Sequence, residues 1–440
     1  MYFLYSLLLT LAFLMLLPYF AWQAVVPRKY VNNIAERLGR FHPDWHNDAR
    51  PTLWLHAVSV GETLASLPLL KALRAQFPNH RLIISTTTAS GQQVARERAV
   101  EADGICYFPY DWRFAVRRAL AVIRPQAVIL MESELWPNFL TECRTQGIPV
   151  LVANGRVSDR SFRRAYRMRR LLKPLYCQVS CFLMQTATDA ERVLALGANP
   201  ANVKVSGNLK YDIGAAGLSA KQLTISQDLN KAYSLTTPGA SLIIAGSTAE
   251  NAGEEEEQIL LEALRALRKT AVGEHARLLI APRHPERFAA IAAWLAETEF
   301  QVARRSTKQA MPEAEVILLD SIGELGTLYQ FAQIVFVGGS LVPKGGHNIL
   351  EPALYGKPIV VGPHMENFRA ITQEFLKREA LLQLNTGDRQ ALAMQLSVAF
   401  ERLLSDQAYT QRLGANARKT IEANRGATER TVAAVAKLLS

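Results

Sequence analysis

Glu62 is a carboxylate at the turn between a predicted strand and a predicted helix. The apolar run Leu53–Val60 is typical of a buried parallel strand, and Leu64–Gln76 is rich in helix-forming residues. In open α/β sheets such turns lie at the carboxyl edge of the strands, where ligands bind, and the first helical turn favours an ionised carboxylate at neutral pH. Glu62 is therefore a candidate general base; the alternative is that it only caps its own helix.

A glycine-rich loop follows the predicted strand Ile334–Val337. It begins with Gly338-Gly339-Ser340, continues through Pro343–His347 and leads into a helix at Asn348. Backbone N–H groups of glycines before a helix can bind an anion, so this loop predicts a phosphate cradle. It matches neither GxGxxG nor a P-loop, and implies neither a dinucleotide nor an NTPase. Glu351 could accept two ribose hydroxyl hydrogen bonds, whereas the alternative is an ordinary Asn-capped helix start.

Further polar side chains follow other predicted strands. Ser247 could offer donors to a phosphate, Arg283 could pair with one, and the Lys210 ammonium could neutralise a departing phosphate, although a solvated lysine is equally consistent with its position. Glu132 and Glu134 end another strand. Paired carboxylates could hold a metal ion, but no Asp-x-Asp motif elsewhere completes such a site, so we expect no metal.

Strand-like and helical stretches alternate along both halves of the chain. The predicted strands are 53–60, 80–87, 104–109, 127–131, 149–153 and 181–185, then 242–245, 276–281, 315–319, 334–337 and 358–361. Such alternation predicts parallel sheets with helices on both faces, and 440 residues allow two or three domains. We expect doubly wound α/β domains at 27–210 and 239–440, a linker at 211–238 and a ligand cleft between the sheets. The acidic run Glu254–Glu257 suits a helix start and is assigned no chemistry.

Basic residues outnumber acidic residues by 50 to 39, which gives a net charge of +11 and indicates an anionic partner. Eight of them fall in Arg156–Lys173, beside one acid and apolar residues at helical spacing. This pattern predicts one basic amphipathic helix that meets acidic lipid headgroups; a solvated helix face is the alternative. No recognised nucleic-acid module accompanies the charge, so we expect no nucleic-acid partner.

Residues 1–26 contain no charged side chain and are mostly apolar. Positive charges follow only from Arg28 onward, which predicts an uncleaved, single-pass membrane anchor with the remaining chain in the cytoplasm. A helix lying on the membrane is the alternative, because the run is short and contains Pro18. The four cysteines lack CxxC pairing, which does not indicate a zinc site and suits reduced thiols.

Several of these segments form a combined signature. They are the N-terminal anchor, His56–Glu62, Met131–Asn138, Gly207–Lys210, Pro282–Arg287 and Gly345–Pro352. Together they resemble the 3-deoxy-D-manno-octulosonic acid (Kdo) transferases of lipopolysaccharide assembly. The resemblance extends from the anchor to the C-terminal helices, although loops such as 213–237 carry no signature.

The resemblance implies a fold and a reaction. The fold is the two-Rossmann-domain glycosyltransferase fold known as GT-B, with the acceptor bound by the N-terminal domain and CMP-Kdo by the C-terminal domain. The reaction is inverting transfer of Kdo to a lipid A precursor (lipid IVA), without metal or other cofactor, at the inner-membrane phospholipids of a Gram-negative cell. Glu62 is implied to be the base, and Glu132 and Lys210 to stabilise the transition state. The residues implied to contact CMP are Pro282, Arg283, Gly323, Glu324, Leu325, Asn348, Ile349, Leu350 and Glu351.

Two other classes of protein share parts of this pattern. A soluble GT-B sugar-nucleotide epimerase would have the fold and the cradle, but should lack the anchor and the basic helix. A non-catalytic, membrane-bound anion-binding module would have the charge, but would not need Glu62.

Overall fold

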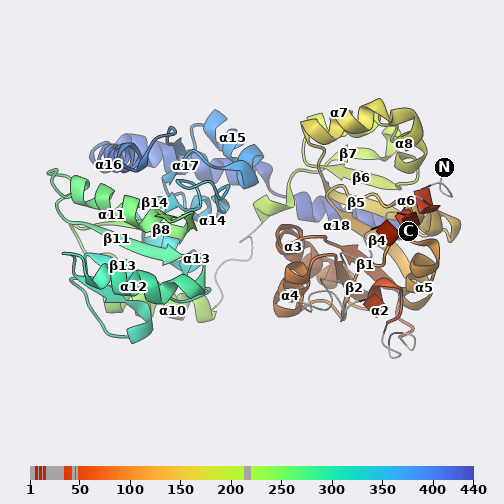
Figure 1. Ribbon diagram of the computed structural model, residues 1–440, viewed down its shortest axis with the longest axis horizontal. Helices are drawn as coiled ribbons and strands as arrows, with labels where there is room; N and C mark the ends of the chain where they lie inside the picture. Colours follow the sequence, from red (N-terminus) through yellow and green to blue (C-terminus); the bar gives the residue numbers. More distant parts are fainter. Residues whose placement is uncertain are drawn as a thin grey trace. The chain divides into compact units, whose positions relative to one another are not determined.

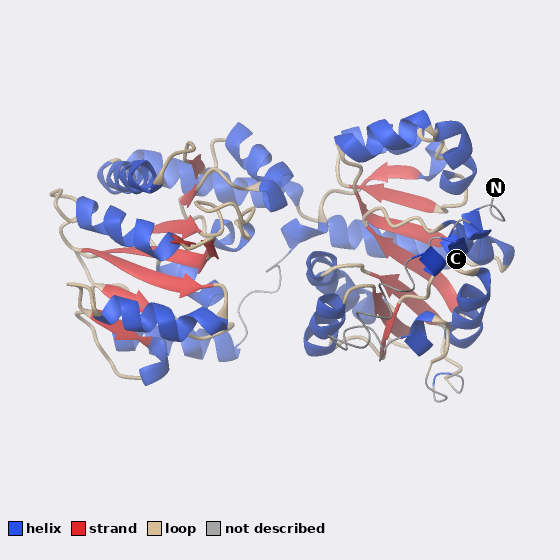
Figure 2. Ribbon diagram, viewed as in Figure 1, coloured by secondary structure: helices blue, strands red, loops and turns tan. Residues whose placement is uncertain are grey.

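The structure of the chain, a computed structural model, describes residues 5–7, 9–11, 13–15, 34–41, 45, 48–212 and 220–440. The chain divides into two compact units: Met1–Ile213 with Asn424–Ser440, and Gly214–Ala423. Each unit contains its own seven-stranded sheet, covered by helices on both faces (Figures 1 and 2). The predicted α/β class with two doubly wound parallel sheets is confirmed.

The sheet of the first unit has the order β3-β2-β1-β4-β5-β6-β7, and its strands are parallel. The strands are β1 Thr52–His56, β2 Arg81–Thr86, β3 Gly104–Tyr107, β4 Pro125–Met131, β5 Val150–Gly155, β6 Cys181–Met184 and β7 Val203–Val205. The direction of winding reverses between β1 and β4, where His56 lies beside Leu130. In open α/β sheets, ligands bind outside the carboxyl ends of the strands at such a switch point.

The core of the first unit lies on both faces of this sheet, because successive strand residues point to opposite faces. Trp54 packs with Phe139 on one face, whereas Leu53 and Leu55 pack on the other. The helices are α2 Ile34–Arg37, α3 Val60–Gln76, α4 Ala89–Arg98, α5 Arg113–Ile123, α6 Pro137–Thr145, α7 Asp159–Arg167, α8 Arg169–Tyr176, α9 Ala187–Ala195 and α18 Ala427–Leu439.

Helix α18 belongs to the first unit, although the sequence analysis extended the second domain to residue 440. Its Ala427 and Val435 are buried in the same cluster as Leu69 of α3. The Asp212 carboxylate accepts hydrogen bonds from the N–H groups of Gly426 (2.8 Å) and Thr428 (2.6 Å), at the start of α18. Apolar burial and this capping carboxylate therefore fix α18 against the first sheet.

The sheet of the second unit has the order β12-β13-β11-β8-β14-β15-β16 and is also parallel. Its strands are β8 Ser241–Thr248, β11 Ala276–Pro282, β12 Val302–Arg304, β13 Val316–Leu318, β14 Ile334–Val337, β15 Ile359–Val361 and β16 Leu382–Gln383. Its helices are α10 Ala220–Tyr233, α11 Glu256–Leu267, α12 Phe288–Ala296, α13 Leu325–Leu328, α14 Leu350–Leu354, α15 Arg369–Lys377, α16 Arg389–Ser405 and α17 Gln407–Asn424. A small hairpin, β9 Glu250–Asn251 with β10 Glu254–Glu255, precedes α11.

Two local expectations differ from the structure. The predicted linker 211–238 contains α10, whose Leu229 and Tyr233 are buried one helical turn apart. The basic segment predicted as one helix forms α7 and α8 instead, and they meet at Met168, whose backbone leaves the helical conformation (φ −104°, ψ 14°). A run of charged residues carries no signal for such a break.

The predicted membrane anchor 1–26 lies mostly outside the described residues. Within the described part of the chain, no helix combines the length and the apolar character that a membrane span requires.

Candidate active site

Glu62 lies in the first turn of α3, directly after the turn from β1, and its side chain is buried (9% exposed). One carboxylate oxygen accepts a hydrogen bond from the Val58 N–H (2.9 Å), and the other accepts from the Ser59 hydroxyl (3.0 Å). Glu62 therefore does stabilise the start of its own helix, as the alternative interpretation expected. Each oxygen still keeps lone-pair capacity for a proton.

The electrostatic environment of Glu62 favours proton exchange near neutral pH. The pKa of Glu62 is raised to about 7, mainly by burial and also by the charges of Glu132 and Glu134, whereas the Val58 and Ser59 hydrogen bonds oppose this shift. From the sequence we expected the helix terminus to keep this group ionised at neutral pH. Desolvation opposes the helix terminus and raises the pKa toward neutrality. A carboxyl group with such a pKa is suited to act as a general base.

Glu132 follows β4, the neighbour of β1 across the switch point. Its backbone is left-handed (φ 57°), a conformation that is uncommon for residues other than glycine. Its N–H donates to the Ala153 carbonyl (2.9 Å), which fixes this turn. Burial and the charge of Glu132 also raise the pKa of Glu134. The structure thus brings together three carboxyl groups, and strain of this kind is often found at functional sites.

Lys210 lies in the loop that follows β7, and this loop is fixed by side-chain amides that the sequence analysis did not identify. The Asn154 carboxamide oxygen accepts from the Leu209 N–H, and the Asn208 oxygen accepts from the Lys210 N–H (both 3.0 Å). Gln185 connects Asn154 and Asn208. Its side-chain oxygen accepts from the Asn208 amide, and its side-chain nitrogen donates to the Asn154 backbone carbonyl (both 3.0 Å). The Asn154-Gly155 pair at the end of a strand was the available sequence signal, because Asn tolerates the left-handed backbone found there (φ 56°).

In the second unit, Ser247 and Arg283 lie at the ends of the neighbouring strands β8 and β11. Ser247 has a left-handed backbone (φ 59°), and the Arg283 N–H donates to the Thr248 carbonyl (2.9 Å). The Arg283 side chain is exposed. The pKa of His347 is lowered to about 4, mainly by burial and also by the nearby charges of Arg283 and His284. A neutral His347 beside an arginine can therefore serve as a hydrogen-bond partner next to a positive charge.

The glycine-rich loop after β14 differs from the phosphate cradle that the sequence predicted. The buried Glu256 carboxylate, at the start of α11, already accepts from the N–H groups of Gly339 (2.7 Å), Ser340 (2.9 Å) and Leu341 (2.7 Å). It also accepts from the Ala249 N–H (2.8 Å). The Glu256 carboxylate thus already binds the backbone N–H groups that the predicted cradle would offer to a phosphate. From the sequence, Glu254–Glu257 was assigned no chemistry, and this role of Glu256 was not predicted.

The remaining predicted nucleotide contacts gather beside α13 and α14. The Asn348 amide donates to Glu351 (3.2 Å), and the Asn348 oxygen accepts from the Leu350 N–H (3.1 Å). A side chain at Gly326 would lie 3.4 Å from the Glu351 carboxylate, so the Asn348–Glu351 and Gly323–Leu325 segments are neighbours. The Glu324 carboxylate is paired with Arg305 (2.8 and 3.0 Å), which leaves the backbone of the Gly323–Leu325 segment as its possible ligand contact.

Comparison with known proteins identifies the relatives of this chain. Residues 32–213 match the family described as 3-deoxy-D-manno-octulosonic-acid transferase (kdotransferase). The chain is 33% identical to a 3-deoxy-D-manno-octulosonic acid transferase of Haemophilus influenzae, over 97% of this chain and 96% of that protein. It is 34% identical to the Bordetella pertussis protein of the same name, over 87% and 86%.

Solved structures with low sequence identity share the fold. The UDP-GlcNAc 2-epimerase from Neisseria meningitidis superposes with a TM-score of 0.58 at 13% identity, covering 88% of this chain and 100% of that chain. A glycosyltransferase from Rickettsia africae superposes with a TM-score of 0.54 at 12% identity, covering 89% and 100%. These similarities establish the two-domain architecture and say nothing about the reaction.

The Glu256 hydrogen bonds lead to a stability prediction. In Glu256→Gln, one carboxylate oxygen becomes an NH₂ group that faces two N–H donors, so two buried donors lose their acceptor. We expect a loss of roughly 2 kcal/mol or more in the free energy of unfolding of the second unit. Hydrogen exchange at Gly339–Leu341 and a denaturant titration measure it. The exposed Glu254→Gln serves as the control, and equal stability of both variants would contradict the structural role.

Proposed function

We propose that this chain, which belongs to the 3-deoxy-D-manno-octulosonic acid (Kdo) transferase family, moves Kdo from CMP-Kdo to the lipid A precursor lipid IVA. The family makes the chain a glycosyltransferase, and the choice of acceptor, the stereochemistry and the metal independence are our proposal. The buried Glu62 carboxyl, with a pKa of about 7 at a sheet switch point, is the observation that carries it.

The proposed reaction is a single displacement with inversion. Glu62 removes the proton from an acceptor hydroxyl, and the oxygen forms a bond to the anomeric carbon of Kdo while the bond to the CMP phosphate breaks. The proton remains on Glu62 and the electron pair leaves with CMP. The negative charge of Glu132 suits a sugar carbon that becomes positive in the transition state, and the Lys210 ammonium stabilises developing negative charge.

The second unit offers the groups that a CMP-sugar requires. Arg283 supplies an exposed positive charge, and the backbones at Ser247, Pro282 and Gly323–Leu325 supply polar groups at strand and helix ends. Asn348 orients the Glu351 carboxylate, which can accept from ribose hydroxyls. CMP leaves with one phosphate, whose charge these cations can meet without a divalent ion. Within the described residues, no group of three His, Cys, Asp or Glu side chains could hold a metal ion.

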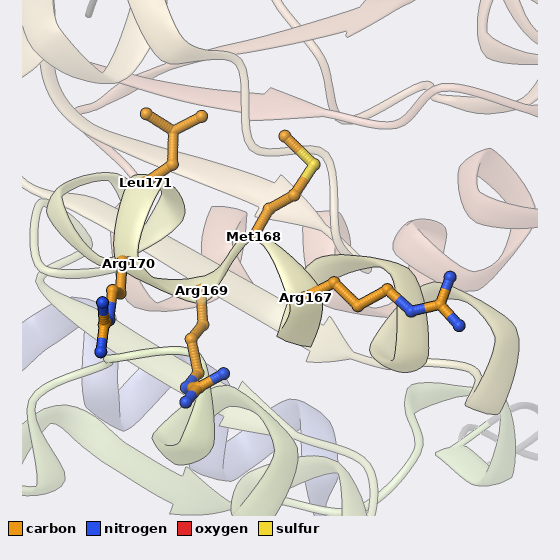
Figure 3. A pocket seen from close by; sticks show the side chains of 5 residues that line it. All are labelled: Arg167, Met168, Arg169, Arg170 and Leu171. Carbon is orange, nitrogen blue, oxygen red and sulfur yellow. The ribbon is translucent and has the colours of Figure 1, made fainter.

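A basic surface on α7 and α8 suits contact with inner-membrane phospholipids on the cytoplasmic face. Its exposed side chains include Arg163, Arg164 and Arg167. Around the break between the helices, Arg167–Leu171 line a hollow of about 350 Å³, from which the labelled arginines extend (Figure 3). Met168 and Leu171 are half exposed beside them. Basic groups flanking exposed apolar side chains are typical of surfaces that meet anionic lipid.

The alternative functions have less support. The similarity to epimerases rests on the fold alone, whereas the similarity to Kdo transferases covers the sequences of both units. A non-catalytic binding module would not require a carboxyl group with unused lone-pair capacity at the switch point of the first sheet.

Product analysis tests the proposed reaction. We expect the pure protein, given CMP-Kdo and lipid IVA in EDTA, to release CMP and to form a Kdo-lipid whose anomeric configuration is inverted. Mass spectrometry counts the Kdo units, and NMR reports the configuration. Activity that disappears in EDTA and returns with Mg²⁺ would contradict metal independence, and retained configuration would contradict the single displacement.

Glu62→Gln tests the base. The amide keeps the shape of the side chain but cannot take a proton, so turnover should fall by roughly 10² to 10⁴ while CMP-Kdo binding remains. In the unmodified protein kcat/KM should rise with pH through about 7, because only ionised Glu62 is a base. Glu134→Gln is the matched control. It removes a negative charge that raises the pKa of Glu62, so the rise of kcat/KM should move to lower pH. Near-normal turnover of folded Glu62→Gln would exclude the role.

Glu351→Ala tests the nucleotide contact. Loss of a ribose acceptor should weaken CMP binding by about 1 to 3 kcal/mol without changing the affinity for the acceptor lipid. Calorimetry with CMP measures this change, and the exposed Glu313→Ala in the same unit is the control. Unchanged CMP affinity in Glu351→Ala would show that this carboxylate does not contact the nucleotide.

A further inference from the structure

We infer that the N-terminal helical segment, defined by residues 5–7, 9–11 and 13–15, lies along the first unit in the plane of one membrane leaflet and does not cross the bilayer. One side of the segment is attached to the first unit, and the other side is apolar and exposed. The inference states how the proposed enzyme meets its membrane, and so rests on the proposed function. Its test, however, requires no transfer reaction.

Specific polar contacts attach the segment to the first unit. The Asn138 amide donates to the Ser6 hydroxyl (3.0 Å), and the Trp112 indole N–H donates to the Thr10 hydroxyl (3.2 Å). Phe13 packs edge-on against Trp112, with ring centroids 4.9 Å apart. Positions 6, 10 and 13 share one side of a helix. This side is therefore matched to a polar and aromatic receptor on the folded unit.

The receptor is itself hydrogen-bonded into the fold. The buried Asp111 carboxylate accepts from the N–H groups of Asn138 (3.0 Å) and Phe139 (2.8 Å), and so caps α6. The Tyr5 hydroxyl hydrogen-bonds to the same carboxylate. The N-terminal segment thus binds the end of the β4–α6 connection, which also carries Glu132.

The opposite side of the segment is apolar and uncovered. Its side chains, which are between 45% and 81% exposed, are those of Leu7, Leu11, Leu14 and Met15. The exposed Phe114 stacks on Trp112 and carries the Arg118 guanidinium over its ring (5.4 Å). Arg113 and Arg117 are both half exposed and share the single charge of Glu142, which leaves net positive charge beside the apolar surface.

The occupant that fits this chemistry is an anionic lipid leaflet. Leucines enter the acyl region, aromatic rings lie at the interface and arginines reach the headgroups. In a spanning helix, Ser6 and Thr10 would lie in hydrocarbon, the Asn138 amide would lose one of its two acceptors, and the Trp112 indole would lose its acceptor. The attached arrangement satisfies these groups and still gives the leucines an apolar environment.

Disulfide trapping in the full chain distinguishes the two arrangements. The Cys177→Ser background removes the exposed cysteine, and the protein is bound to vesicles of phosphatidylethanolamine and phosphatidylglycerol. We expect Ser6→Cys with Asn138→Cys to form a 6–138 disulfide, identified by mass spectrometry, both in detergent and on vesicles. Leu7→Cys with Asn138→Cys, on the exposed side, should not. A 6–138 disulfide that forms in detergent but not on vesicles, or in neither, would overturn the inference.

Depth measurement keeps the test independent of the Asn138 substitution. Spin labels at Leu7→Cys, Leu11→Cys and Leu14→Cys should report similar depths on vesicles, because an in-plane helix keeps one side at one level. A spanning helix rises about 1.5 Å per residue, so positions 7 and 14 would differ by roughly 10 Å. A steady gradient of that size would contradict the in-plane arrangement.

The free apolar side should also supply membrane affinity. Leu11→Gln with Leu14→Gln should reduce vesicle binding by roughly tenfold or more, because two leucines no longer enter the acyl region. The control is Val100→Gln with Val205→Gln, which replaces two exposed apolar residues elsewhere on the first unit. Equal binding of both double variants would show that the segment does not contact lipid.

Discussion

Backbone N–H groups buried at the ends of strands and helices need acceptors, and in this chain buried carboxylates provide several of them. Glu256 accepts from four such groups, and Asp111 and Asp212 each accept from two at the start of a helix. These interactions order the glycine-rich loop, the start of α6 and the start of α18. The loops that carry the candidate site are therefore fixed before any ligand binds.

The number of hydrogen bonds that each carboxylate accepts distinguishes the structural Glu256 from the proposed base Glu62. Each oxygen of Glu256 accepts two N–H groups, which uses the lone-pair capacity of the carboxylate. Each oxygen of Glu62 accepts only one hydrogen bond, and Glu132 and Glu134 add negative charge nearby. Both residues lie at helix starts on the carboxyl edge of a parallel sheet. Of the two, Glu62 keeps the greater lone-pair capacity, so the environment and not the residue type makes it the proposed base.

Local patterns explain which features could be predicted from the sequence. The strand, turn and helix around Glu62 are contiguous, so periodicity was sufficient to find them. The Glu256 contacts join residues 83 positions apart, and no periodic pattern reports such a pairing. The role of Asn154 depends on a left-handed backbone inside a strand, which residue type only suggests. In residues 1–26 the overall apolar composition concealed the spacing of Ser6, Thr10 and Phe13, which determines what the helix packs against.

The position of α18 has a consequence for synthesis of the chain. The first unit buries Ala427 and Val435 against α3, so its core contains residues that are translated after the whole of the second unit. During synthesis from the N-terminus, the second unit can complete its core first. Until α18 is translated, the apolar surface of Leu69 on α3 remains uncovered. The proposed base, Glu62, lies on α3. The helix that carries the proposed base is therefore packed completely only after α18 has been translated.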